Sequence, residues 1–214
     1  MDFAPPTGLR KHARCPNCTA LERHRLQFLV LHEVLRDRKT AHLKMLHIAP
    51  EPFFREFFSQ RFGQYETADL KMKGVDHIVD LQHLPFGDKT YDFIFASHVL
   101  EHIPDDQKAI SEIRRILKPN GIAILPVPIY PGKTIEYPEP NPHESYHVRA
   151  PGMDYFDRYE RHFSNVERFS SGSLPEKYQL FSYEDHSQLS AKEHPWLSSM
   201  QGEKFSDCVP VCYV

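Results

Sequence analysis

The sequence lacks an excess of basic residues. Its 214 residues include 26 lysines and arginines against 29 aspartates and glutamates, which gives a formal net charge of −3. Proteins that bind nucleic acid usually carry a basic face, so nothing in the charge supports a nucleic-acid partner. No apolar run approaches the roughly 20 residues of a membrane helix, and residues 1–14 have no signal-peptide apolar core. We therefore expect a cytoplasmic protein that acts away from membranes.

Cysteine is also scarce, with four residues in the chain. In a cytoplasmic protein these are expected to be thiols or metal ligands instead of disulfides. Cys15 and Cys18 have the spacing of a zinc knuckle, and Cys208 and Cys212 could supply the other half of a zinc site. Cysteines four apart on a strand point to the same face, which suits core packing equally well. Zinc binding, core packing and redox activity all remain open at this point.

What the sequence does have is an alternation of apolar strands and amphipathic helices. Near-continuous apolar strands on either side of a helix indicate a parallel sheet that is covered on both faces. We therefore predict an α/β fold with a single doubly wound, mostly parallel sheet. The expected strands cover residues 43–49, 65–70, 75–80, 166–170 and 207–213, with two more beginning at Tyr91 and after Gly121. The expected helices cover residues 20–36, 51–62 and 153–162, with another after Pro104. The first helix is expected to begin with a capping box formed by Thr19 and Glu22.

Polar side chains follow several of the expected strands. Asp69 ends the second strand and Asp80 the third, while Ser97 and His98 follow the strand that begins at Tyr91. In a parallel sheet the residues just past the carboxyl ends of the strands line the ligand crevice. We therefore expect these side chains to lie along one edge of the sheet and to form a binding site.

The residues around this crevice resemble a known family. Tyr91–Asp106 reads YDFIFASHVLEHIPDD, the following helix ends in IRRILKPNG, and Asp80 begins a D-L-x-x-L-P-F signature. Together with the CPNC…LERHR and HIAPE segments, these motifs resemble the class I S-adenosylmethionine-dependent methyltransferases, in particular their type 11-like subgroup. The resemblance covers residues 15–129 in order, and His147-Val-Arg149 is a further match. It implies a Rossmann-like methyltransferase fold with S-adenosyl-L-methionine as the cofactor.

The resemblance also assigns residues to the cofactor. Asp69 would accept hydrogen bonds from the ribose hydroxyls, and Asp80 would meet the adenine amino group, with Leu70 and Leu81 following the two acids. The turn after the first strand normally carries glycines, but here it reads His47-Ile-Ala-Pro-Glu-Pro52, a replacement that the subgroup shares. The members of this turn that would line the methionine end are His47, Ala49 and Glu51. Ser97 and His98 would lie against the sulfur.

The chain is divided, on this interpretation, into two parts. Residues 1–40 would form a loose arm, the Cys-x-x-Cys knuckle and a helix, and residues 41–214 the methyltransferase domain. Residues 130–152 change in composition to Pro, Tyr, His and Glu without periodicity, and such a long loop is usually a functional lid. Residues 171–206 form a polar insertion whose pattern indicates no role.

The expected reaction is methyl transfer to an oxygen or nitrogen nucleophile of a small polar molecule. Glu101 and His102 would point towards that acceptor, while the lid, with His143, Tyr146, His147 and Arg149, would close over the bound cofactor and shape the acceptor pocket. Because an imidazole has an ordinary pKa near 6.5, either His102 or His147 would be a workable base at neutral pH. A divalent metal held by His98, Glu101 and His102 is the alternative. The H-x-x-E-H pattern of inverted zinc peptidases does not fit, because it requires a helix and His98 follows a strand.

A rival hypothesis comes from the missing glycines and the irregular C-terminal part. The chain could be a methyltransferase-fold protein that has lost catalysis and serves as a binding or regulatory protein. Asp69, Asp80 and the polar segment 97–102 would have no use in such a protein. Their joint presence favours the enzyme.

Overall fold

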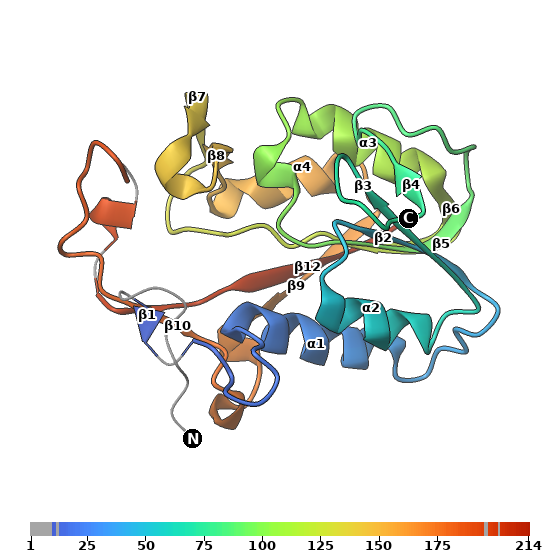
Figure 1. Ribbon diagram of the computed structural model, residues 1–214, viewed down its shortest axis with the longest axis horizontal. Coiled ribbons are helices and arrows are strands. Elements are labelled where there is room, and N and C mark those ends of the chain that lie inside the picture. The colour runs from blue at the N-terminus through green and yellow to red at the C-terminus, as the bar shows by residue number, and fades with distance from the viewer. Residues whose placement is uncertain (1–9, 12, 195–196, 201) are drawn as a thin grey trace.

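A seven-stranded sheet forms the centre of the molecule in the computed structural model, which describes residues 10–11, 13–194, 197–200 and 202–214. Its order is β4-β3-β2-β5-β6-β12-β9 (Figure 1). The strands are β2 (Lys44–Ile48), β3 (Gln64–Asp69), β4 (His77–Ile78), β5 (Tyr91–Ala96), β6 (Leu117–Ile124), β9 (Asn165–Ser170) and β12 (Cys208–Tyr213). Strands β2 to β6 run parallel, and only β12 is antiparallel to its neighbours β6 and β9. The predicted doubly wound α/β fold is therefore confirmed.

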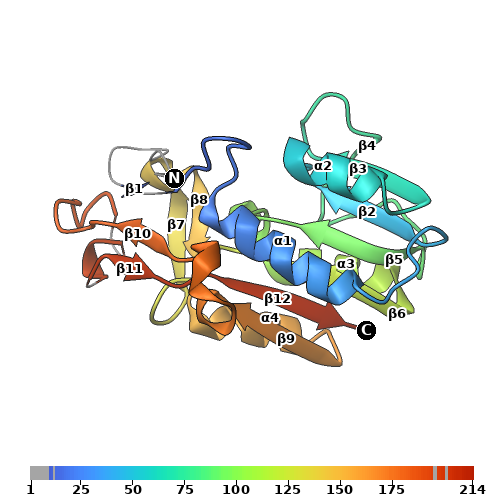
Figure 2. The same ribbon diagram turned by 90° about the horizontal axis from the view of Figure 1, so that it is seen from below.

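Helices cover both faces of this sheet, as Figures 1 and 2 show. Helices α1 (Glu22–Leu35) and α2 (Pro52–Ser59) pack on one face, where their apolar side chains join those of β2 and β5. Helices α3 (Asp106–Ile116) and α4 (Phe156–Glu160) cover the other face. Because α1 shares its core with the sheet, residues 22–35 pack as part of the same body. The loose arm predicted for residues 1–14 falls mostly outside the described residues.

The start of α1 differs from the predicted capping box. The helix begins at Glu22, and His24 Nδ1 accepts the N–H of Leu21 at 3.2 Å. Thr19 lies too early to cap, because it belongs to a tight turn in which its N–H donates to the carbonyl of Cys15. Its φ of 60° is left-handed, unlike the extended backbone that a capping residue needs.

The predicted lid and the predicted insertion both contain regular structure. Residues 130–152 include a hairpin of β7 (Ile135–Asn141) and β8 (His147–Ala150). The insertion contributes β10 (Ser182–Glu184) and β11 (Lys204–Phe205), which form a small sheet with β1 (Arg10–Lys11). Short 3₁₀ helices fill the connections: η1 (Leu100–His102), η2 (Pro142–Glu144), η3 (Met153–Tyr155), η4 (Ser171–Ser173), η5 (Glu176–Tyr178) and η6 (Leu197–Ser199). In the described part of the chain, no helix is long and apolar enough to cross a membrane.

Arg149 fastens the lid to the segment that follows β5. Its side chain is only 3% exposed and donates to the carbonyls of Leu100, Ile103 and Pro104 at 2.6–2.9 Å. Its Nε also donates to Glu136 at 3.0 Å. A buried guanidinium with this many acceptors holds two segments in one fixed arrangement. The lid is therefore a docked part of the fold.

His47 lies inside the core, which corrects its predicted place at the cofactor. The side chain is 1% exposed, and its ring packs edge-on against Phe58 and Phe95. Its Nδ1 is 2.9 Å from the hydroxyl of Tyr65. Burial lowers the pKa of His47 to about 3, so the ring is neutral at physiological pH.

Arg149→Met should lower the free energy of unfolding by about 3–5 kcal/mol, because three carbonyls lose their donor and the buried carboxylate of Asp106, 3.5 Å from Arg149 Nε, loses one of its cations. Arg36→Met is the matched control, since its ion pair with Glu33 is exposed on both sides and should contribute about 0–1 kcal/mol. Urea denaturation of the two variants checks this. Equal losses in both would show that Arg149 does not anchor the lid.

His47→Asn should flatten the dependence of stability on pH. The folded-state pKa of about 3 lies below the ordinary value near 6.5, so in this window the unfolded chain binds a proton that the folded chain does not. Stability is then fully present above pH 6.5 and is lost as the pH falls, by up to about 1.4 kcal/mol per pH unit. Denaturant titrations between pH 4 and 7 should show a shallower slope for the variant. Parallel curves would mean that His47 is protonated in the folded protein.

Candidate active site

Two predicted carboxylates lie at the carboxyl ends of neighbouring strands. Asp69 ends β3, and its Oδ1 accepts the N–H groups of Lys71 and Met72 at 2.7 Å. Asp80 follows β4 and accepts the N–H of Gln82 at 2.8 Å, which lowers the pKa of its carboxyl group. Leu70, directly after Asp69, is 56% exposed and presents an apolar surface beside the two acids. This pair of acceptors next to an apolar side chain suits a nucleoside.

Two left-handed residues follow the two central strands. Ala49 comes directly after β2 with a φ of 48°, and His98 follows β5 with a φ of 53°. Their N–H groups are fixed by the carbonyls of Ala68 and Pro126, both at 2.8 Å. Such backbone costs about 1–3 kcal/mol for a residue other than glycine, and two such residues at neighbouring strand ends are consistent with a binding site there. Ala49 thus adopts the left-handed backbone that is normally supplied by a glycine in this turn.

Glu51 carries a carboxylate oxygen that is free to bind a ligand. It precedes α2, and its Oε1 lies 2.8 Å from His24 Nε2 and 3.5 Å from Arg23. Its Oε2 is buried and has no hydrogen-bond partner among the described residues. Burial raises the pKa of Glu51, but the hydrogen bond from His24 and the nearby charge of Arg23 outweigh this effect and the net shift is downward. The group is therefore an anion with one unused oxygen.

Two further members of the predicted cofactor set face the interior. Ser97 is 6% exposed and lies 3.2 Å from Gln27 Oε1, so its hydroxyl ties β5 to α1. Leu81 is 5% exposed and belongs to the core on the α3 side. Neither side chain is placed to contact a bound molecule, which corrects these two assignments.

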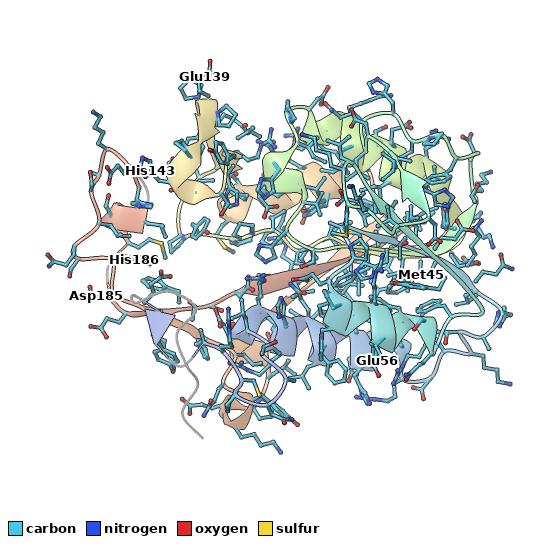
Figure 3. The ribbon with its side chains drawn as sticks, in the orientation of Figure 1. Met45, Glu56, Glu139, His143, Asp185 and His186 are labelled. Carbon is cyan, nitrogen blue, oxygen red and sulfur yellow. The ribbon has the colours of Figure 1, made fainter. Side chains whose placement is uncertain are left out.

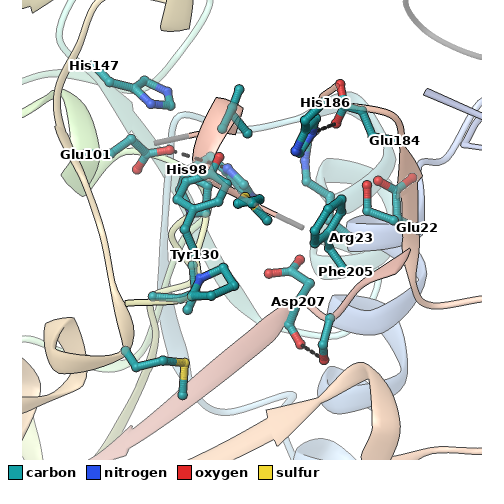
Figure 4. Close-up of a pocket in the computed structure, with 18 of the residues that line it drawn as sticks. Glu22, Arg23, His98, Glu101, Tyr130, His147, Glu184, His186, Phe205 and Asp207 are labelled. Atoms are coloured by element: carbon teal, nitrogen blue, oxygen red, sulfur yellow. Dashed lines mark hydrogen bonds and ion pairs between the residues drawn. The ribbon is translucent and has the colours of Figure 1, made fainter. Parts of the chain in front are cut away.

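A pocket of about 730 Å³ opens beyond the end of β5 (Figure 4). His98, Glu101, Tyr130 and His147 line one side of it. Residues from α1 and from the insertion line the other side: Glu22, Arg23, Glu184, His186, Phe205 and Asp207. These side chains can carry charge or form hydrogen bonds, but apolar side chains such as Ile129, Met153, Leu197 and Met200 complete the wall, so the pocket offers both polar and apolar surface.

Glu101, His102 and His147 come together in the wall of this pocket. The ring centroids of the two histidines are 4.7 Å apart, and one ligand atom from each of the three residues lies within 4.8 Å of the others. Glu101 is completely buried, and neither carboxylate oxygen receives a hydrogen bond from the described residues. His98 Nδ1 lies 3.4 Å from Glu101 Oε1, an ion-pair distance. All three residues predicted to act on the acceptor are thus in one place.

The protonation of this cluster follows from its burial. Burial lowers the pKa of His147 to about 4, so its ring is neutral at pH 7 and is a weaker base than an ordinary imidazole. Burial raises the pKa of Glu101, but its interaction with His98 outweighs this effect and the net shift is downward. Glu101 is therefore an anion whose oxygens lack donors.

The opposite wall was not predicted from the sequence. Glu22 and Arg23 belong to the L-E-R-H-R segment, which served only to identify the family resemblance. The insertion adds Glu184 and His186 from a stretch without periodicity, and Asp207 comes from the residue directly before β12. The His186 ring stacks on Phe205 at 4.8 Å, and burial raises the pKa of Asp207. The L-E-R-H-R motif could have pointed to this wall, but nothing in the insertion could.

The charged residues of the lid lie mostly outside the pocket. Arg149 and Glu136 form the structural contacts described above, and Glu144 accepts a hydrogen bond from Tyr137 at 2.6 Å. Glu139 is exposed at the far end of the lid, and His143 lies on the side towards His186 (Figure 3). The lid lines the pocket through Tyr130, Pro131, Ser145 and His147.

The four cysteines do not form a zinc site. Cys208 and Cys212 are buried in the core on the α3 side, and burial raises the pKa of the Cys208 thiol to about 12. Cys15 and Cys18 form the predicted tight turn, but no closely spaced group of potential metal ligands in the described chain contains a cysteine. The later pair therefore packs as ordinary core residues.

Residues 43–125 match the model of a family described as a methyltransferase domain. A sterol 4-C-methyltransferase of Caenorhabditis elegans is 40% identical over 82 residues, which are 38% of this chain and 24% of that protein. The first curated relatives are matched over 17–25% of their own lengths, so the likeness is limited to one domain.

Solved structures extend the likeness to most of the chain. An S-adenosylmethionine-dependent methyltransferase from Mesorhizobium loti has a TM-score of 0.55 at 14% identity, covering 88% of this chain and 98% of its own. A phosphoethanolamine N-methyltransferase 2 from Haemonchus contortus, in complex with S-adenosylhomocysteine, has a TM-score of 0.56 at 16% identity and covers 87% and 52%. At such identities the likeness shows the fold. The matches therefore show a methyltransferase domain over residues 43–125, within a chain whose fold is like that of S-adenosylmethionine-dependent methyltransferases.

Proposed function

We propose that this protein transfers a methyl group from S-adenosylmethionine to an oxygen or nitrogen nucleophile of a small polar molecule. The observation that carries the proposal is the order of groups along one edge of the sheet. Asp80 and Asp69 follow β4 and β3, the left-handed Ala49 and His98 follow β2 and β5, and the pocket begins beyond β5. These strands are neighbours in the sheet, so a cofactor laid along their ends would reach the pocket with its reactive end.

The residues along this edge fit the parts of the cofactor in turn. Asp69 would accept hydrogen bonds from the ribose hydroxyls, and Asp80 would accept one from the adenine amino group beside Leu70. The unused Oε2 of Glu51 would bind the ammonium group of the methionine part. The turn at Ala49 would let the backbone approach the cofactor where a larger side chain would obstruct it. When bound, the cofactor supplies the methyl group as an electrophile on a sulfonium.

The pocket beyond β5 would hold the acceptor. Acids, histidines and two cations (Arg23 and Lys204) in its lining would bind the polar groups of the acceptor, and the apolar side chains beside them would pack against its carbon skeleton. The protein would align the nucleophile with the methyl group and exclude water from the site. A hydroxyl acceptor would also have to lose its proton. Glu101, His102 and His147 are the groups placed to promote that loss.

The rival role, a methyltransferase-fold protein without catalysis, explains fewer of these features. Such a protein would not need left-handed backbone at Ala49 and His98, nor a buried anion at Glu101 in the wall of an open pocket. Calorimetry with S-adenosylmethionine and S-adenosylhomocysteine is the first test of the enzyme. Failure of both to bind would reject the proposed function.

Asp69→Ala and Asp80→Ala should weaken the binding of S-adenosylhomocysteine. Loss of a hydrogen bond to a charged group costs about 1.5–3 kcal/mol, so the dissociation constant should rise on the order of tenfold or more. Asp37→Ala is the matched control, because Asp37 is exposed after the end of α1 and lies outside the proposed site. Calorimetric constants equal to those of the parent protein in both site variants would remove the basis of the adenosine assignment.

Glu51→Gln should weaken the binding of S-adenosylhomocysteine but leave the binding of 5′-methylthioadenosine unchanged. The second ligand has the same nucleoside and sulfur but lacks the amino-acid part, so it cannot use the carboxylate of Glu51. Glutamine keeps an oxygen for His24 while removing the charge, and the loss for the first ligand should again be about tenfold. Asp69→Ala, in contrast, should weaken the binding of both ligands. If Glu51→Gln lowered the affinity for both ligands equally, Glu51 would lie away from the methionine end of the cofactor.

A further inference from the structure

We propose that Glu101, His102 and His147 bind one divalent transition-metal ion in the wall of the pocket. Glu101 and His102 lie in η1, and His147 is the first residue of β8. One ligand atom from each residue lies within 4.8 Å of the other two. Small side-chain rotations are enough to bring all three atoms around one ion.

The surroundings of Glu101 are the main reason to infer a cation. The side chain is 0% exposed, and both of its oxygens lack hydrogen bonds from the described residues. An ionised carboxylate accepts hydrogen bonds at both oxygens in water, and burial without replacements is strongly unfavourable. His98 Nδ1, at 3.4 Å from one oxygen, compensates for only part of that loss. A cation beside the carboxylate would satisfy the group.

The histidines indicate which kind of cation this is. His147 Nδ1 is buried and has no hydrogen-bond partner in the described structure, so the nitrogen is free to coordinate. Two imidazoles and one carboxylate suit ions such as Zn²⁺, Co²⁺, Mn²⁺ and Fe²⁺, whereas Mg²⁺ and Ca²⁺ prefer oxygen ligands alone. Three protein ligands also leave coordination positions that face the pocket.

The arrangement is held from outside the cluster. Arg149 donates to the carbonyls of Leu100 and Ile103 at the two sides of Glu101 and His102, while its own backbone continues β8 two residues after His147. One guanidinium thus fixes the relative positions of all three ligands. Ion ligands need this kind of support from surrounding residues.

The class of acceptor follows if the proposed methyl transfer is correct, and this step rests on that proposal. An acceptor with a hydroxyl beside a second oxygen, such as an α-hydroxy acid, would bind the ion through both oxygens. The bound hydroxyl would lose its proton to His98, whose Nε2 has no partner in the described structure. The oxygen would then attack the methyl carbon, and the electron pair of the broken S–C bond would stay on sulfur. The products are the methyl ether and S-adenosylhomocysteine, and the proton passes from His98 to water.

Titration of the full chain with Co²⁺, followed by calorimetry and proton NMR, tests the site. We expect one ion per chain and hyperfine-shifted N–H signals from two imidazoles, with Mg²⁺ unable to compete at equal concentration. Glu101→Gln and His147→Ala should weaken binding about a hundredfold, since even residues that only orient metal ligands contribute about 10–100-fold. His102→Ala provides the same test if Glu101→Gln or His147→Ala fails to fold, because His102 is exposed and its replacement should not disturb the core. His83→Ala, also exposed, is the matched control.

The outcomes separate this inference from the proposed function. S-adenosylhomocysteine should bind the parent and the metal-site variants equally, so its affinity tests the methyltransferase and the Co²⁺ affinity tests the metal site. Absence of bound Co²⁺ would overturn the inference. Loss of Co²⁺ binding in His143→Ala, with binding retained in the other variants, would also overturn it, because His143 belongs to a second cluster with Glu193 and His194. Glycolate should change the visible absorption of the bound Co²⁺. An unchanged spectrum would reject the α-hydroxy-acid acceptor.

Discussion

The contact between Arg149 and the carbonyls that follow β5 is the interaction on which the pocket depends. Carbonyl groups in an irregular segment need donors when they are buried, and one guanidinium supplies donors to three of them. The same side chain anchors the hairpin of β7 and β8 through Glu136. Without it, η1 and the lid would each be free to move, and Glu101, His102 and His147 would not stay together.

The two halves of the site differ in how far the sequence could predict them. Asp69 and Asp80 were found because strands have a recognisable pattern and their ends follow from it. His47 shows the limit of this approach: alternation along β2 puts it on the same face as Met45, against the helices, and not at the end of the strand. The direction in which the His47 side chain points is therefore set by the face of the strand and not by its place in the turn motif.

The remaining walls could not be predicted because they depend on contacts between distant parts of the chain. β1 pairs with β10, which places residues near position 10 beside residues near position 184. Glu184, His186 and Asp207 lie with Glu22 and Arg23 in the same wall of the pocket, although they are far apart in the sequence. A segment without periodicity, such as residues 171–206, carries no local sign of such a partner. Its role became visible only in three dimensions.

The position of β12 has a consequence for the synthesis of the chain. This strand lies between β6 and β9, so residues 208–213 fill a gap inside the sheet. Until these residues have left the ribosome, β6 has one unpaired edge and β9 has no strand to pair with in this sheet, and unpaired strand edges favour association between chains. Asp207, directly before β12, also reaches the pocket only at that stage. A nascent chain should therefore need protection from aggregation until the strand is inserted, and it should complete its pocket in the same late step.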